Sequence, residues 1–485
     1  MVRQGQRQRT VFVCQECGHE SPRWMGFCPS PLCASGLPLV EVQATPAKSA
    51  GTGQIGGEAV PAQELAQVNT ESNPRIRLPS DELNRVLGGG LVAGSVVLLA
   101  GEPGVGKSTL LLQIAHAVAS QGRKVLYVSG EESPQQIKLR SQRLGFTGEG
   151  VFLLSETDVD LVVKQFEECR PAIGIVDSIQ TLYCQETSSS PGSVAQVRES
   201  GLRLMRWAKK RHVPMLLAGH ITKDGSVAGP RVLEHMVDVV AYMEHQEFSD
   251  YRIVRSSKNR FGSTNEVGVF EMTGQGLSDV PDPSRALLSQ RYDQAVGSAL
   301  VPVLEGTRPL LLEVQALTSP SQLPVPRRIA NGLDHNRLLM LTAVASRRAG
   351  LELANQDIIA SVAGGFRISE PAADLAVLLA IASSMRNEVL DPGLVALGEV
   401  GLSGELRSVP QAQRRLAEAA RLGFSRCVLP QTALEGLAKP EGMELIPART
   451  LRQAFQAVMI NARGQKADSL GDHLDEESFT SLETG

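Results

Sequence analysis

Long hydrophobic runs are missing from this 485-residue sequence. No apolar stretch approaches the roughly 20 residues that a membrane-spanning helix requires. The polar residues 1–5 also lack the pattern of a secretory signal peptide. We therefore expect a cytoplasmic protein that has no membrane partner.

An excess of positive charge is missing too, because 48 Lys and Arg residues face 52 Asp and Glu residues, for a net charge of -4. Proteins that attract nucleic acid through their overall charge are strongly basic. Any nucleic-acid surface on this protein must therefore be local.

The length of the chain exceeds that of one ordinary hydrophobic core and predicts about three domains.

Cysteine is scarce, and four of the seven cysteines fall within the first 33 residues. In a reducing compartment, two close cysteine pairs favour a metal site over disulfides. The predicted ligands of one Zn²⁺ ion are the four thiolates of Cys14, Cys17, Cys28 and Cys33. Four residues separate the second pair, so His19 stays open as an alternative to Cys33. We predict a zinc-binding domain over residues 1–43 and a flexible linker over residues 44–73.

The most informative stretch is a glycine-rich turn between an apolar strand and a helix. It consists of Gly101, Glu102, Pro103, Gly104, Val105, Gly106, Lys107, Ser108 and Thr109. This is the phosphate-loop pattern, in which the glycines let backbone N–H groups surround phosphate oxygens at a helix N-terminus. We expect Lys107 to reach the terminal phosphates of ATP and Ser108 to bind Mg²⁺.

Polar side chains follow three further predicted strands, and ligands in parallel α/β sheets bind at such strand ends. The strand at 124–129 leads to Glu131 and Glu132, and either carboxylate is placed to orient and deprotonate an attacking water. The strand at 172–177 ends in Asp177, which is typical of an acid that holds Mg²⁺ through water. The strand at 213–218 leads to His220, which is either a sensor of the γ-phosphate or a structural histidine.

A short cationic turn lies between two segments that are predicted to be strands, at 251–254 and 266–271. Its residues are Lys258, Asn259, Arg260, Phe261 and Gly262. Two cations beside an aromatic side chain suit phosphate chemistry. The turn is a finger that reaches a neighbour's nucleotide, a clamp on a nucleic-acid backbone or simply a solvated turn.

These motifs, together with residues 176–181 and 219–225, resemble the bacterial RadA (Sms) family of RecA-like ATPases of DNA repair and recombination, over nearly the whole chain. The resemblance implies an α/β RecA-like P-loop ATPase core, at residues 74–280. It also implies a DNA-dependent ATPase and helicase that forms a homo-hexameric ring on single-stranded DNA. This ring would use ATP for branch migration of recombination intermediates, with the recombinase RecA as a functional partner. In this family, Lys258 and Arg260 would act in DNA binding and ATP turnover across subunits.

Residues 285–461 resemble the α+β proteolytic domain of Lon proteases. The likeness lies in predicted strands at 299–318, an alanine-rich helix at 370–383 and a hairpin at 398–406. The positions of the Lon nucleophile and lysine fall on Ala372 and Gln413, and neither side chain can serve a Ser–Lys dyad. We therefore expect an inactive scaffold with no peptidase activity.

The predicted scaffold would serve ring assembly or DNA contact. Arg407, Arg414 and Arg415 are candidates for a basic surface on it. Residues 462–485 are polar and acidic and predict a disordered tail. Two other functions stay open: a nucleotide-switched binding module that does not translocate, and an ATP-dependent protease.

Overall fold

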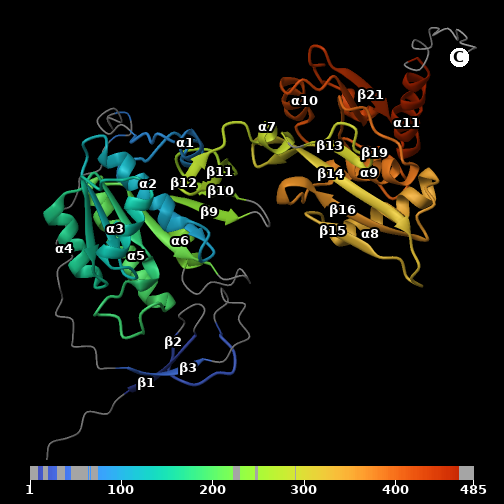
Figure 1. Ribbon diagram of the computed structural model, residues 1–485. Helices are drawn as coiled ribbons and strands as arrows, with labels where there is room; N and C mark the ends of the chain where they lie inside the picture. Colours follow the sequence, from blue (N-terminus) through green and yellow to red (C-terminus); the bar gives the residue numbers. More distant parts are fainter. Residues whose placement is uncertain are drawn as a thin grey trace, which may run out of the picture. The chain divides into compact units, whose positions relative to one another are not determined.

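The computed structural model shows two compact units (Figure 1), whose main parts are Met1–His245 with Asp250–Pro281, and Asp282–Gly485. The residues that it describes are 9–14, 20–29, 39–44, 64, 66, 75–221, 230–245, 250–289 and 291–468. Within these ranges, no helix is long and apolar enough to cross a membrane.

A small antiparallel sheet lies near the N-terminus. Its order is β2-β1-β3, with β1 (Arg9–Val13), β2 (Glu20–Ser21) and β3 (Val40–Ala44). Cys14 and Cys28 are buried in one small cluster with Leu39. The other predicted zinc ligands, Cys17 and Cys33, lie outside the described residues, as do His19 and nearly all of the predicted linker.

A nine-stranded sheet of order β12-β11-β10-β9-β4-β8-β7-β5-β6 forms the centre of the first unit. The six parallel strands are β4 (Val96–Gly101), β5 (Val125–Ser129), β6 (Val151–Ser155), β7 (Ile173–Asp177), β8 (Met215–His220) and β9 (Val239–His245). Three antiparallel strands extend it, β10 (Tyr251–Asn259), β11 (Val267–Thr273) and β12 (Gly276–Asp279).

Helices cover both faces of this sheet, as the alternation of strand and helix patterns predicts. Its helices are α1 (Asp81–Leu87), α2 (Lys107–Ala119), α3 (Pro134–Arg143), α4 (Val159–Cys169), α5 (Val194–Arg211) and α6 (Pro230–Met236), with the 3₁₀ turn η2 (Ile179–Thr181). Alternate residues of β4 enter two separate hydrophobic clusters, one with α1–α3 and the other with α4–α6. The apolar strand that precedes the phosphate loop is therefore buried on both sides.

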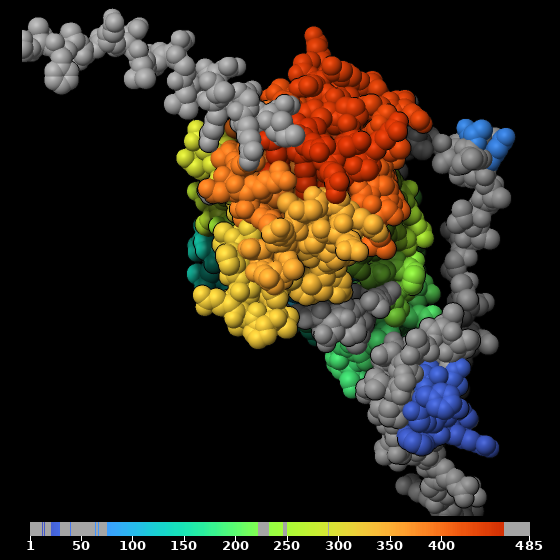
Figure 2. Space-filling view, turned by 90° about the vertical axis from the view of Figure 1, so that its right-hand side faces the viewer, coloured from blue at the N-terminus to red at the C-terminus, as the bar shows by residue number. Residues whose placement is uncertain are grey.

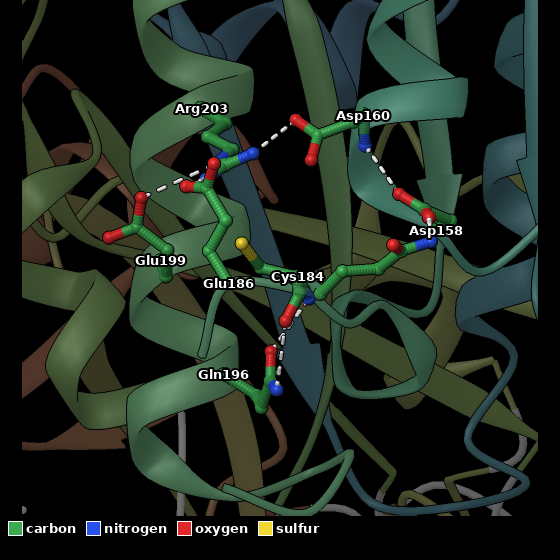
Figure 3. Close-up of polar contacts among 8 residues, drawn as sticks. Asp158, Asp160, Cys184, Glu186, Gln196, Glu199 and Arg203 are labelled. Atoms are coloured by element: carbon green, nitrogen blue, oxygen red, sulfur yellow. Dashed lines mark hydrogen bonds and ion pairs between the residues drawn. The ribbon is translucent and has the colours of Figure 1, made fainter. Parts of the chain in front are cut away.

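Two side chains of α5 fasten the polar segment between η2 and α5 (Figure 3). The amide of Gln196 accepts from the backbone N–H of Cys184 at 2.7 Å and donates to the backbone oxygens of Cys184, Thr187 and Ser189. Arg203 forms ion pairs with Asp160, Glu186 and Glu199. The segment is therefore an ordered connection, although it contains no helix or strand.

The second unit is built on a seven-stranded sheet of order β15-β16-β14-β13-β17-β20-β21. Its strands are β13 (Ser298–Glu305), β14 (Arg308–Pro320), β15 (Arg328–Asn331), β16 (Gln356–Val362), β17 (Leu394–Ala396), β20 (Arg426–Pro430) and β21 (Glu444–Ala448). The predicted hairpin is present as β18 (Glu399–Val400) and β19 (Leu406–Arg407). In Figure 2, the orange and red segments of this unit lie against its yellow segment.

The helices of this unit are α7 (Pro283–Leu288), α8 (His335–Val344), α9 (Asp374–Arg386), α10 (Ala412–Arg421) and α11 (Leu451–Asp468). Short helical turns are the π turn η3 (Ala345–Ala349) and the 3₁₀ turns η4 (Ala363–Gly365), η5 (Pro371–Ala373) and η6 (Gln431–Leu434). Helix α9 packs on β13 and β14 and is buried through Ser383. The predicted alanine-rich helix is therefore confirmed, although its first turn is the separate η5.

Two boundaries differ from the sequence prediction. Strand β10 continues to Asn259, because its pairing with β9 extends to Val239, so the predicted cationic turn begins inside a strand. Helix α11 continues to Asp468, past the predicted start of the disordered tail at 462. The rest of that predicted tail, 469–485, lies outside the described residues.

Arg415 does not belong to a basic surface, contrary to the sequence prediction. Its side chain is 1% exposed and donates two hydrogen bonds of 2.6 Å to the two carboxylate oxygens of Glu370. It also donates to the backbone oxygen of Pro302 at 2.9 Å. A buried charge with this many partners ties α10 to the segment before η5 and is structural.

Candidate nucleotide-binding site

The residues predicted to bind and hydrolyse ATP follow strand ends at one edge of the nine-stranded sheet. Strand β8 lies between β4 and β7, and His220 is in register with Gly101 at the end of β4. Asp177 at the end of β7 is in register with Ser129 at the end of β5. Because these strands are parallel, the phosphate loop, His220, Asp177 and the turn after β5 share the carboxyl edge, where ligands bind in such sheets.

The phosphate loop has the backbone that its glycines predict. Gly104 and Gly106 have φ angles of 79° and 117°, in the left-handed region that favours glycine. A Cβ on Gly106 would lie 2.7 Å from the Cε atom of Met272, so a side chain there would also require the methionine to move. Helix α2 begins at Lys107, so its N-terminal N–H groups are directed at the loop.

The Lys107 ammonium is buried and closes the phosphate loop. Its Nζ atom donates to the backbone oxygens of Gly101 and Glu102, both at 2.8 Å, and the residue is 3% exposed. Burial lowers the pKa of Lys107 to about 8, although the negative charges of Asp177, Glu131 and Glu102 oppose this shift. Three carboxylates therefore share the electrostatic environment of this ammonium.

The two acids of the turn after β5 have different partners. Glu131 Oε1 accepts a hydrogen bond from Ser178 Oγ at 2.7 Å and lies 3.4 Å from His220 Nε2. Its side chain is 50% exposed. Glu132 instead forms an ion pair with Arg140 of α3. Glu131 is thus the acid that joins the strand ends of β7 and β8, while Glu132 is held toward α3.

Asp177 is held by a tyrosine that sequence reasoning missed. The hydroxyl of Tyr127, on the neighbouring strand β5, donates to Asp177 Oδ2 at 2.7 Å. Tyr127 is 1% exposed, and burial together with the Asp177 charge raises its pKa well above the usual value. The available signal was a tyrosine hydroxyl in the middle of an otherwise mostly apolar strand.

Two further contacts to this site come from distant parts of the sequence. Arg252 of β10 donates from Nε to the backbone oxygen of Val105 at 3.2 Å and so holds the phosphate loop from the side. Gln180 donates from Nε2 to the backbone oxygen of His220 at 3.3 Å, and His220 Nδ1 is buried without a hydrogen-bond partner. No local sequence pattern predicts either contact.

The donor atoms suit Mg²⁺ held jointly with a phosphorylated ligand. Mg²⁺ typically takes one or two protein oxygen ligands and completes its shell with water and phosphate oxygens. The predicted ligands, Ser108 in the first turn of α2 and Asp177 at the end of β7, have oxygen atoms of this type. Among the residues with described positions, no group of three or more His, Cys, Asp or Glu side chains is arranged to hold a metal alone. Of the predicted zinc ligands, only Cys14 and Cys28 are among these described residues.

The cationic turn lies at the opposite edge of the sheet from the phosphate loop. Val239 of β9 is in register with Asn259 and with Val97 near the start of β4, whereas Met243 is in register with Gly101 at the end of β4. The length of the strands therefore separates this turn from the phosphate loop of the same chain.

Within the cationic turn, the uncharged residues are structural. The amide of Asn259 donates to the backbone oxygen of Val86 at 3.2 Å and accepts from the Phe261 N–H at 2.8 Å. A Cβ on Gly262 would lie 2.8 Å from the Cα atom of Gly88, the glycine that ends α1. These contacts fasten the turn to α1.

The two cations of the turn bind other groups. Lys258 Nζ donates to the backbone oxygens of Glu234 and His235 at the end of α6, at 2.8 and 3.0 Å. Arg260 Nη1 lies 3.2 Å from Asp238 Oδ1, and the Arg260 side chain is 52% exposed. Arg260 therefore keeps half of its surface available to a ligand.

Known proteins resemble both the first unit and the whole chain. The AAA domain family matches residues 62–226. The DNA repair protein RadA of Bacillus subtilis (strain 168) is 46% identical over 453 residues, which cover 93% of this chain and 98% of that protein. The RadA proteins of Halalkalibacterium halodurans and Listeria monocytogenes are 47% and 43% identical, over 93% of this chain and 99% of each relative.

The fold of the first unit and the similarity to known proteins both indicate an ATPase. A mainly parallel sheet with a phosphate loop after its central strand β4 fits a RecA-like P-loop ATPase core, for which ATP and Mg²⁺ are the implied ligands. Identities of 43% to 47% extend over nearly the full length of both partners in each comparison. The chain belongs to the RadA family of DNA repair proteins.

Proposed function

We propose that this protein is a DNA-dependent ATPase of DNA repair and homologous recombination. It binds single-stranded DNA as a homo-hexameric ring and drives branch migration of recombination intermediates, with the recombinase RecA as its functional partner. The observation that carries the ATPase assignment is the position of Lys107, Glu131 and Asp177 at or just after strand ends on one edge of the sheet, where Ser178, next to Asp177, donates to Glu131 Oε1 at 2.7 Å. The relatives named DNA repair protein RadA support the biological role.

Each residue of the site has a distinct task in this proposal. Lys107 and the N–H groups of the phosphate loop bind the phosphates of ATP. Glu131 orients the attacking water and takes its proton, because its carboxylate is exposed while that of Glu132 is engaged by Arg140. Mg²⁺, when bound, would neutralise charge on the phosphates, and Ser108 and Asp177 are the residues that would hold it.

His220 is proposed to sense the γ-phosphate. It lies between the phosphate loop and Asp177 in the order of the strands, and its Nε2 atom is 3.4 Å from the carboxylate of Glu131. A change in the position or charge of Glu131 on ATP binding therefore acts directly on the imidazole. This is a route from nucleotide state to the end of β8.

The cationic turn is proposed to act between subunits. Because Lys258 and Arg260 lie at the sheet edge opposite the phosphate loop, any role of theirs in ATP turnover concerns the nucleotide of a neighbouring copy. Replacement of either residue by Ala is expected to uncouple DNA from ATP turnover. For comparison, Lys107→Ala is expected to abolish ATP hydrolysis both with and without DNA. A Lys107→Ala protein with normal turnover would remove the basis of the ATPase assignment.

The regions on either side of the ATPase core have proposed roles of their own. Residues 1–43 are proposed to bind one Zn²⁺, and the burial of Cys14 and Cys28 in one cluster supports this. Residues 285–461 are proposed to be an inactive Lon-like scaffold. Ala372, at the position of the nucleophile, is 2% exposed, and Gln413 accepts a hydrogen bond from the backbone N–H of Ala438. Degradation of casein by the purified protein would contradict the scaffold proposal.

A further inference from the structure

A buried carboxylate organises cations at the sheet edge opposite the phosphate loop. Asp238 lies between α6 and β9, and its side chain is 5% exposed. Its Oδ2 atom accepts the backbone N–H of Val96, at the start of β4, at 3.1 Å. Its Oδ1 atom lies 3.2 Å from Arg260 Nη1 and 3.7 Å from Lys209 Nζ. Two cations from separate elements thus converge on one oxygen atom.

Lys209 reaches this position because of the chain's path. It lies in the last turn of α5, whose C-terminus leads into the start of β8, and the start of β8 is in register with Val96. The end of α5 therefore lies at the same sheet edge as the cationic turn. Nothing in the local sequence around Lys209 connects it with Arg260, which is in a different part of the fold.

The two cations carry more positive charge than their shared partner removes. One carboxylate balances only one of them, and the side chains of Lys209 and Arg260 are 53% and 52% exposed. Lys258 belongs to the same electrostatic cluster. Burial lowers its pKa first, the positive charges of Arg260 and Lys209 lower it further, and Asp238 and Glu234 oppose the shift.

We propose that Lys209 and Arg260, positioned by Asp238, form a two-cation site for a phosphate group, in which Lys209 is a necessary member. The ligand is a phosphodiester of single-stranded DNA or the phosphate chain of a nucleotide bound by a neighbouring copy. This inference rests on the proposed function. The nucleotide bound by the same chain is not the ligand of this site, because the length of the strands separates the site from the phosphate loop.

This site attracts phosphate because the single negative charge of Asp238 does not neutralise the two positive charges of Lys209 and Arg260. Two cations drawn to one oxygen repel each other, and a phosphate that offers an oxygen to each relieves this repulsion. The planar guanidinium of Arg260 supplies paired donors and the Lys209 ammonium a compact charge, a combination that suits phosphate without reading a base. We therefore expect binding at this site to be independent of sequence and sensitive to salt.

The test compares Lys209→Ala with Lys210→Ala. Lys210 is the adjacent exposed lysine at the same helix end, so both variants lose the same charge and disturb packing little. The probe is a fluorescein-labelled oligothymidine whose anisotropy is followed across a salt series with ATP present. If the ligand is DNA, Lys209→Ala weakens binding and lowers the slope of log affinity against log salt by about one, and Lys209→Arg restores both.

A second arm identifies a nucleotide ligand. In that case Lys209→Ala leaves oligothymidine affinity unchanged but lowers ATP turnover. Mixing it with Lys107→Ala then recovers turnover, because the second variant supplies Lys209 to a neighbour whose phosphate loop is intact. The proposal is overturned if Lys209→Ala matches Lys210→Ala in both affinity and turnover. A wild-type protein that neither binds oligothymidine nor hydrolyses ATP contradicts the proposed function instead.

Discussion

The Nε2 atom of His220 lies 3.4 Å from Oε1 of Glu131, the same oxygen that accepts the hydrogen bond of Ser178. This contact joins the last residue of β8 to a residue of the turn after β5, and it places the proposed base beside the proposed γ-phosphate sensor. A water that enters this site meets a carboxylate whose position already depends on its neighbours.

Glu131→Gln is expected to reduce ATP turnover by at least about 100-fold, because the amide cannot accept a proton from water. Glu132→Gln is the matched control, since it makes the same change one residue away at a carboxylate paired with Arg140. It should retain most of the turnover. Steady-state phosphate release measures both variants, and fluorescent-nucleotide binding should show similar affinities. A larger loss in the Glu132 variant would reverse the assignment.

The affinity for ATP is expected to fall as the pH rises above about 8, where the free Lys107 ammonium loses its proton. Bound phosphates favour the charged amine, so binding above this pH takes up a proton and becomes less favourable. Between about pH 7 and pH 9 the loss from this group is roughly tenfold. Fluorescent-nucleotide titrations measure it. Lys107→Arg keeps its charge throughout, so a similar fall in that variant would place the titration elsewhere.

Tyr127→Phe is expected to raise the Mg²⁺ concentration needed for half-maximal nucleotide binding by about tenfold. The change removes only the hydroxyl that orients the Asp177 carboxylate, and lost support of this kind typically weakens metal affinity by about 10- to 100-fold. Titration of Mg²⁺ against a fluorescent ATP analogue measures the shift. An unchanged Mg²⁺ dependence with a lowered melting temperature would show that Tyr127 only supports folding.

Metal analysis of the full-length protein is expected to find about one Zn²⁺ per chain. Cys28→Ser should lose the metal, because Cys28 is buried beside Cys14 in the N-terminal cluster. Cys169→Ser is the control, since Cys169 is a partly exposed thiol of the first unit with no predicted metal role. Zinc that persists in Cys28→Ser would exclude this thiolate as a ligand.

Local patterns predicted the phosphate loop and its strand and helix. The glycine spacing dictates the backbone around Gly104 and Gly106, and the helix begins at Lys107 as expected. The strand ends could be placed at one edge because apolar runs mark buried parallel strands. These features depend on neighbouring residues, so a sequence shows them directly.

The remaining features depend on contacts between distant residues. The difference between Glu131 and Glu132 arises from Ser178 and Arg140, neither of which adjoins the pair. The burial of Arg415 follows from its pairing with Glu370, so a charged side chain predicted for the surface lies inside the second unit. Pairing of this kind follows from the tertiary fold and has no local sequence signal.

The most direct test of the proposed DNA-dependent ATPase is steady-state ATP hydrolysis by the wild-type protein with and without single-stranded DNA, at low and high salt. The Lys107→Ala variant, assayed in parallel, measures the background hydrolysis that does not come from this site. We predict that DNA raises turnover and that the increase shrinks at high salt, because phosphate contacts dominate binding. Turnover that stays the same with and without DNA at both salt concentrations would contradict the proposal and favour a nucleotide-switched binding module.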